Sequence, residues 1–354
     1  MNKKKNKLWS VVAIILAVTS IFVVANQTKD YSWEDFKLYI TSANPFWIAV
    51  AMLCMLLYIF FEGYAILRIL KVFGHKRSLR KGIIYSSADI YFSAITPSAS
   101  GGQPASAFFM MADGVPAGVS AVALMVNLVM YTVSIMTIGI IAVILRPELF
   151  IRFEPFSKFL IIVGYIILGA LVFAIILLLR KEKWVHAICS FILRLLSKIR
   201  IIKRIDKLQN KLDAIIEEYK TCSEMIDGHR GMLAEVFICN FLQRNLQICV
   251  SVMIFLADGG KIADVVDVWA THAFAIIGSN CVPVPGAMGV IDYLLLDGMK
   301  NLMIADDATS LELTSRGISF YCCVLLCLII VGIGYFVLRK RANHESISEE
   351  KKEC

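Results

Sequence analysis

Charged residues are scarce in this chain. Only 18% of its 354 residues are charged and 58% are hydrophobic, with a mean hydropathy of +0.71. Soluble globular domains carry about 25% charged and about 45–50% apolar residues. Apolar runs of roughly 20 residues, the length that crosses a bilayer, recur along the sequence. The composition excludes a cytosolic enzyme, a secreted disulfide scaffold and a soluble nucleic-acid-binding protein, and it predicts a polytopic membrane protein.

The sequence also lacks the motifs of nucleotide and metal chemistry. It has no GxxxxGK[ST] loop and no GxGxxG that opens a helix after a strand, and its ten cysteines form no CxxC pair. Most of the cysteines lie in apolar segments, where they are typical of packed helices. We therefore expect no cofactor, no metal and no catalytic residue, and ATP-driven transport would need a partner chain.

The net charge of +8 comes from 36 Lys and Arg against 28 Asp and Glu, and the basic residues gather at the ends of apolar runs. Basic clusters follow the runs that end near residues 73, 179 and 338. The positive-inside rule places those ends in the cytoplasm. Four lysines precede the first run, so we expect the N-terminus and the C-terminus both to be cytoplasmic.

Six apolar runs are long enough to cross the membrane: 8–25, 44–73, 115–145, 157–179, 232–257 and 319–338. Two other regions, 82–114 and 262–296, are interrupted by proline and glycine. The flanking spans place both ends of each interrupted region on one side, so each region is expected to be a re-entrant helical hairpin. The acidic residues before the last span, among them Asp297 and Glu312, are expected in an outer loop.

Each half then contains three spans and one broken hairpin, and the odd number gives the halves opposite orientations. This plan is an inverted repeat, which is common in secondary transporters. We predict an all-α polytopic membrane protein with about six full spans plus the two hairpins. Its parts are a first half at 1–150, a span with a basic amphipathic helix (188–219) at 151–230, the rest of the second half at 231–340, and a charged cytoplasmic tail at 341–354.

The amphipathic helix has two interpretations. Its basic part could lie on the anionic surface of the cytoplasmic leaflet, where each basic residue contributes about 1 kcal/mol. Alternatively, the helix only connects the halves.

The two breaks are candidate binding elements, because non-helical backbone at membrane depth is tolerated only inside protein or beside a wet cavity. The half-helix after each break offers a positive N-terminus suited to an anion such as a phosphate. A packing kink without a ligand is the alternative. The candidate residues are Thr96, Ser98, Ser100, Gly101, Gly102 and Gln103 in the first break, and Pro283, Pro285, Gly286 and Gly289 in the second.

Ionisable residues at membrane depth are costly and are candidates for function. Arg244 lies near the centre of the span 232–257, in a polar stretch with Gln243 and Asn240. Its guanidinium could bind a lipid phosphate through two hydrogen bonds. It could instead form a buried ion pair, and a substrate could displace that pair. The candidate acidic partners are Glu62, Asp89 and Asp292.

The segments Thr96-Pro97 to Gly101-Gly102-Gln103-Pro104 and Pro283-Val284-Pro285-Gly286-Ala287-Met288-Gly289 together resemble the lysylphosphatidylglycerol synthase transmembrane family. The resemblance covers roughly residues 8–340. That family includes the flippase domain of the multiple peptide resistance factor. Relatives often have glycine where Ala287 stands and a glutamate near the position of Asp292.

The resemblance implies a flippase-like protein of lipid metabolism in a bacterial cell membrane, acting on phospholipid such as phosphatidylglycerol or lysyl-phosphatidylglycerol. The family's aminoacyl transfer belongs to a separate soluble C-terminal domain, for which the residues after the last span leave no room, so we do not expect an enzyme. Two alternatives stay open. One is a phosphatidylglycerol lysyltransferase of antibiotic resistance, which would bind nucleic acid only as lysyl-tRNA. The other is a membrane scaffold for a separate synthase or another envelope protein.

Overall fold

The structure is a computed structural model, and it describes residues 41–96, 99–181, 184–187, 190–191, 205–280, 282, 285–287, 289–300 and 302–353. The predicted first span at 8–25 lies outside the described residues. So do Ser98, Pro283 and residues 192–204, which carry much of the basic part of the predicted amphipathic helix.

The described residues form helices and no strand, and six helices are long and apolar enough to cross a membrane. The predicted all-α polytopic architecture is confirmed. Four of the six match predicted spans closely: α3 (Pro45–Val72), α6 (Ala117–Leu145), α8 (Pro155–Arg180) and α11 (Arg230–Ala257). The other two are Ile262–Ser279, which lies in the second broken region, and Asp307–Leu338.

Local signals fix where α3 begins. The Asn44 side-chain oxygen accepts a hydrogen bond of 3.0 Å from the backbone N–H of Phe46, and Pro45 occupies the first helical position. An Asn cap satisfies a backbone donor that the helix leaves open, and proline at this position has no N–H to lose. The span therefore starts where the sequence predicts it.

The first broken region is a helical hairpin of α4 (Leu79–Ile95) and α5 (Gly102–Ala112), with the break where the sequence predicts it. The two helices pack against each other, and α4 also packs on α3. A Cβ on Gly63 of α3 would lie 2.7 Å from the backbone oxygen of Gly82, so glycine permits this close approach.

The second broken region contains α12 (Val265–Ser279), a 3-10 turn η4 (Pro285–Ala287) and α13 (Val290–Met299). Gly286 and Gly289 have φ of 60° and 78°, which glycine adopts without strain. Ala287 has φ of 53°, a left-handed conformation that an L side chain disfavours. The turn η4 packs against α4, so the two broken hairpins meet.

The last helix differs most from the sequence prediction. It begins with α14 (Ala305–Arg316), passes through a π-helical turn η5 (Gly317–Cys322) and continues as α15 (Cys323–Glu353). The prediction of a start at residue 319, with Glu312 in an outer loop, was wrong about this segment. Glu312 is buried, because α14 packs on α11 and α13 as a polar helix that a hydropathy window does not detect.

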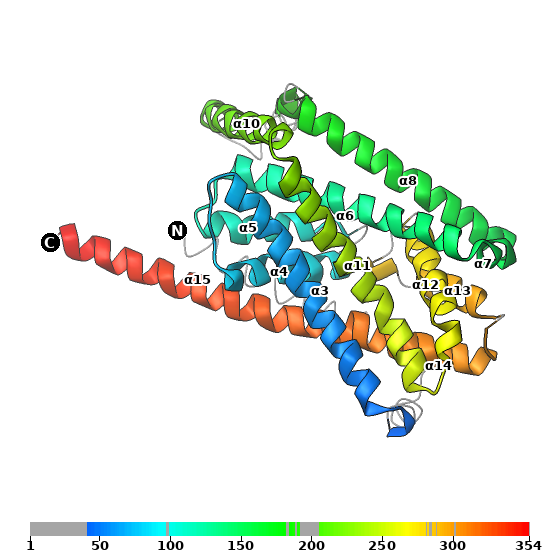
Figure 1. The fold of residues 1–354 in the computed structure, drawn as a ribbon. Helices are drawn as coiled ribbons and strands as arrows, with labels where there is room; N and C mark the ends of the chain where they lie inside the picture. Colours follow the sequence, from blue (N-terminus) through cyan, green and yellow to red (C-terminus); the bar gives the residue numbers. More distant parts are fainter. Residues whose placement is uncertain are drawn as a thin grey trace.

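Helices α3 and α11 run side by side through the centre of the molecule, and α8 lies along one edge on α6 and α12 (Figure 1). The short helix α7 (Pro147–Arg152) joins α6 to α8. The outer surface of α8 is apolar, as expected for contact with lipid chains. Its large exposed side chains include Phe156, Phe159, Ile162, Ile166 and Phe173.

The described part of the amphipathic segment is α10 (Ile205–Asp227), which extends beyond the predicted end at residue 219. It packs on the first turns of α6, where the Glu218 carboxylate accepts a hydrogen bond of 3.2 Å from the N–H of Gly118. A carboxylate at a helix N-terminus is favoured by the helix dipole. The acidic part of this segment therefore packs against helix α6 of the same chain.

Candidate functional site

A buried polar site lies where α3, α4 and α11 meet. Glu62 of α3 is 7% exposed, and its Oε2 accepts a hydrogen bond of 2.9 Å from Nε2 of the fully buried Gln243 of α11. Both side chains lie on helices that the sequence marks as spans. A buried carboxyl group needs such a partner, because an unpaired one would pay the full cost of desolvation.

Asp89 of α4 joins Glu62 in this site. It is 6% exposed, and the charge of Arg244 acts on it as it acts on Glu62. Two donors reach its carboxylate: the Ser93 hydroxyl at 3.1 Å from Oδ1, and Nε2 of Gln103 at 2.8 Å from Oδ2. Gln103 belongs to α5, so Asp89 links the two arms of the first broken hairpin.

The residues of the first break have different roles. The Thr96 hydroxyl accepts a hydrogen bond of 2.8 Å from the N–H of Gly101 and donates one of 2.6 Å to the backbone oxygen of Phe92. Thr96 therefore joins the end of α4 to the residue that precedes α5. Gly102 is buried against Asp89, whereas Ser100 is exposed.

Arg244 of α11 is the cation of the site. It is 7% exposed, and its guanidinium carbon lies 3.8 Å from the ring centroid of Tyr131 and 5.6 Å from that of Tyr58. Its Nη1 donates to the Gln247 side chain, and its Nε is buried without a hydrogen-bond partner. The charge of Arg244 acts on both Glu62 and Asp89, but no carboxylate of the described residues forms an ion pair with it.

Asn240, another sequence candidate, lies one turn from Arg244 on α11. Its Nδ2 donates to Asn127 Oδ1 of α6 at 3.0 Å and to the backbone oxygen of Val236 at 2.9 Å. Its Oδ1 is buried without a partner, as is Oε1 of Gln243. The site therefore offers open acceptors as well as the open donor of Arg244.

Asp292 lies in a second polar centre and not beside Arg244. Its Oδ1 is 3.1 Å from Nε of Arg316, and its Oδ2 accepts a hydrogen bond of 2.8 Å from the N–H of Gly289. Arg316 also lies 3.6 Å from Oε1 of Glu312 and donates to the Gly286 backbone oxygen at 3.3 Å. This centre binds the second break to the helix α14.

The sequence reasoning missed Arg316 and Glu312, because both residues precede the last apolar run. One signal was available: a Glu and an Arg at i and i+4 lie on one face of a helix. The π-helical turn that starts directly after Arg316 has no simple sequence signature.

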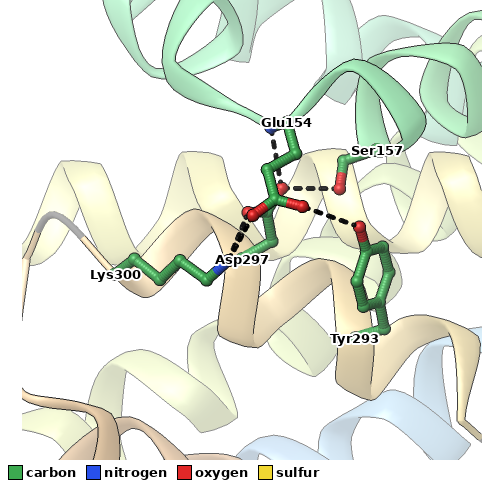
Figure 2. A network of polar contacts seen from close by, with 5 residues as sticks. All are labelled: Glu154, Ser157, Tyr293, Asp297 and Lys300. Carbon is green, nitrogen blue, oxygen red and sulfur yellow. Dashed lines mark hydrogen bonds and ion pairs between the residues drawn. The ribbon is translucent and has the colours of Figure 1, made fainter.

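The second hairpin is also anchored to the start of α8 (Figure 2). Asp297 of α13 accepts hydrogen bonds from the Glu154 N–H at 2.9 Å and from the Ser157 hydroxyl at 2.5 Å. Lys300 lies 2.6 Å from Glu154 Oε1 and 3.2 Å from Asp297 Oδ1, and these hydrogen bonds raise the pKa of Lys300. Tyr293 donates to Glu154 at 3.3 Å. Asp297 thus caps α8 from another helix.

An apolar groove of about 320 Å³ lies between α6, α8 and α12. Its lining includes Ile140, Ile161, Tyr165, Phe274 and Ile277, and none of the residues of the Arg244 site. The groove suits a hydrocarbon chain and not a charged group, because its lining is almost entirely apolar.

The fold and these buried centres define a multi-pass α-helical membrane protein whose polar site is built from a broken hairpin and two spans. The chain belongs to the lysylphosphatidylglycerol synthase TM region family, whose model matches residues 10–327. The match confirms the family resemblance drawn from the two break motifs. No curated protein matches the chain.

Proposed function

We propose that this protein moves phospholipid between the leaflets of a bacterial cell membrane, with both termini in the cytoplasm. Phosphatidylglycerol and its lysyl ester are the substrates that the family membership favours. The observation that carries the proposal is Arg244, a buried arginine with an unpaired Nε and no ion pair to a carboxylate of the described residues.

A buried arginine without a counter-ion is expensive, so it is retained where a ligand supplies the anion. A lipid phosphate matches the planar donor array of a guanidinium and can accept two hydrogen bonds from it. The rings of Tyr131 and Tyr58 hold the guanidinium by cation–π contact while the site is empty. Arg244 is therefore the phosphate-binding residue of the proposal.

The other groups of the site suit the rest of a head group. The open acceptors Oε1 of Gln243 and Oδ1 of Asn240 can take hydrogen bonds from glycerol hydroxyls. The carboxyl groups of Glu62 and Asp89 can take an ammonium group. Phosphate and ammonium occur together in an aminoacylated phospholipid, and the apolar groove and the outer face of α8 suit its acyl chains.

Translocation can be measured in proteoliposomes that contain only this protein and a trace of acyl-labelled fluorescent phosphatidylglycerol. A membrane-impermeant quencher added outside reports how fast inner-leaflet lipid reaches the outer leaflet. We expect quenching beyond the outer-leaflet fraction, at a rate well above that of protein-free liposomes. Equal rates with and without protein, for both phosphatidylglycerol and lysyl-phosphatidylglycerol, would contradict the proposal.

A further inference from the structure

The apolar groove between α6, α8 and α12 lies open on a surface of two helices long enough to cross the membrane. Its lining residues Ile140, Val143 and Ile144 are 49%, 45% and 72% exposed, so the acyl chains of a bilayer can reach it. Among the lining residues that the structure describes, Tyr165 alone carries a polar side-chain atom, and its hydroxyl donates to the backbone oxygen of Met136 at 3.5 Å. The groove therefore offers contact to hydrocarbon and no partner for a polar group.

The size of the groove favours a single chain as its occupant. Its volume is about 320 Å³. One turn of an α-helix with its side chains already fills roughly 400–600 Å³, so a helix of another protein or of a second copy cannot lie within the groove. An extended acyl chain is narrower and has no polar atom to satisfy. The occupant that matches the groove is a hydrocarbon chain of a lipid.

The packing of α8 on α6 places Lys158 at one end of the groove. The Tyr165 hydroxyl bonds to Met136 of α6, and a Cβ on Gly139 would lie 3.7 Å from the Tyr165 ring. The two helices run antiparallel through the short α7, so the part of α8 before Tyr165 lies beside the end of α6 (Figure 1). Lys158, Ile161 and Tyr165 are spaced at i, i+3 and i+7, on one face of α8. Lys158 therefore lies on the groove side of α8, one turn beyond Ile161.

Lys158 can supply its charge to a lipid head group. The neighbouring cations are already paired with carboxylates: Arg146 with Asp267, and Lys300 with Glu154. Lys158 is partly buried and has no carboxylate partner among the residues that the structure describes. A lysine near the end of a span extends its ammonium to the membrane surface, where phosphate groups lie, while its stem packs on apolar side chains.

We propose that the groove and Lys158 form a phospholipid-binding site, in which one acyl chain fills the groove and the lipid phosphate lies against the Lys158 ammonium. A phospholipid joins an apolar chain to an anionic phosphate at the membrane surface, which is the order of the groove and Lys158 along α8. An anionic lipid such as phosphatidylglycerol is favoured over zwitterionic phosphatidylcholine, because it balances the positive charge of Lys158. The site differs in its residues from the Arg244 site, and it holds whether or not the protein translocates lipid.

Photo-crosslinking locates the acyl chain. The full-length protein in neutral detergent receives a trace of phosphatidylglycerol with a diazirine on one acyl chain, is irradiated, and is digested for mass spectrometry. We expect adducts on segments 139–144 of α6 and 161–165 of α8, and unlabelled phosphatidylglycerol should abolish them. Labelling near Phe173, on the open face of α8, should fall only in proportion to the dilution of the probe.

Two variants that fill the groove test its role. Val143→Trp should reduce the labelling of segment 161–165 at least fivefold, and Ile140→Trp is a second filling variant at another exposed lining position. Leu171→Trp is the matched control, because Leu171 is 39% exposed on α8 and lies outside the groove. A symmetric gel-filtration peak verifies each fold.

Two results would overturn the site. One is groove labelling that resists competition as the labelling near Phe173 does and is unchanged in both filling variants, which would indicate bulk lipid only. The other is a groove without label in a protein that elutes as a dimer, which would assign this surface to a second copy of the chain.

The same assay tests the contact with the phosphate. In the wild type, phosphatidylglycerol should displace the probe from the groove at about fivefold lower concentration than phosphatidylcholine does. Lys158→Gln should lose this preference, whereas Lys181→Gln, which replaces an exposed lysine at the other end of α8, should keep it. An unchanged preference in Lys158→Gln would refute the contact between Lys158 and the phosphate.

The outcome is separable from that of the transport proposal. A groove that is labelled and competed in a protein that moves no lipid would leave this site standing and would refute translocation. Lipid translocation by a protein whose groove takes no label would refute this site and leave the transport proposal standing.

Discussion

Gly102 lies directly against Asp89. A Cβ at position 102 would collide with Oδ1 of Asp89 and would lie 2.6 Å from its backbone oxygen. The side chain at the first position of α5 is therefore limited by the acid on α4, and the break and the buried Asp89 form one structural unit. The glycine pair of the first motif has a physical cause here: one of its members leaves the space that Asp89 fills.

We predict that Gly102→Ala displaces Asp89 and breaks its hydrogen bond with Gln103. Overpacking of this kind costs about 1–3 kcal/mol, so the melting temperature of the purified protein should fall and lipid translocation should fall with it. Gly332→Ala is the control, because a Cβ at position 332 would meet no atom within 4 Å. Equal melting temperatures for the two variants would refute the close contact.

The strained alanine of the second break gives the opposite expectation. Ala287→Gly should raise the melting temperature, because glycine removes a left-handed penalty of about 1–2 kcal/mol while it loses about 0.5–1 kcal/mol through a freer unfolded chain. Ala112→Gly at the end of the helix α5 should lower it. A destabilised Ala287→Gly variant would argue against the positive φ of 53°.

The second polar centre predicts that stability lost with Arg316 is partly restored when its two acidic partners are also replaced. Arg316→Gln leaves Asp292 and Glu312 without their cation and should destabilise the protein by roughly 3 kcal/mol. Adding Asp292→Asn and Glu312→Gln removes the unpaired charges and should restore part of the melting temperature. If the triple variant is less stable than Arg316→Gln alone, the three residues do not form a charge-coupled centre.

The network at the start of α8 predicts a dependence on alkaline pH. Hydrogen bonds to Glu154 and Asp297 raise the pKa of Lys300 above its ordinary 10.5. A raised lysine pKa stabilises the folded state below the unfolded pKa, and this contribution is lost as pH rises through the folded pKa. Lys300→Met should therefore melt lower than the wild type at about pH 8, and the difference should shrink at about pH 11. A difference independent of pH would contradict this role.

The sequence predicted the spans and breaks well, and their physical causes are local. A long apolar run such as 117–145 must be helical in a bilayer, because its backbone has no other hydrogen-bond partners there. The Pro and Gly residues after Thr96 cannot continue α4. Glu62, Asp89 and Arg244 stand out because charges inside apolar runs are rare, and the structure brings all three into one region.

The pairing of charges could not be predicted, since it depends on how separate helices pack. Asp292 was a candidate partner for Arg244, but it contacts Arg316 on a helix that hydropathy did not detect. Asp297 was expected in an outer loop, yet it is buried as the cap of α8. Both errors have one cause: a short polar helix or helix end buried by protein has the composition of a loop.

The most direct test of the account is the translocation rate of labelled phosphatidylglycerol and lysyl-phosphatidylglycerol in proteoliposomes containing Arg244→Ala. Arg152→Ala, which removes an exposed arginine at the end of α7, is the matched control. The account predicts that Arg244→Ala moves lipid no faster than empty liposomes, while Arg152→Ala matches the wild type. Wild-type transport by a folded Arg244→Ala protein would contradict the assignment of Arg244 as the phosphate-binding residue.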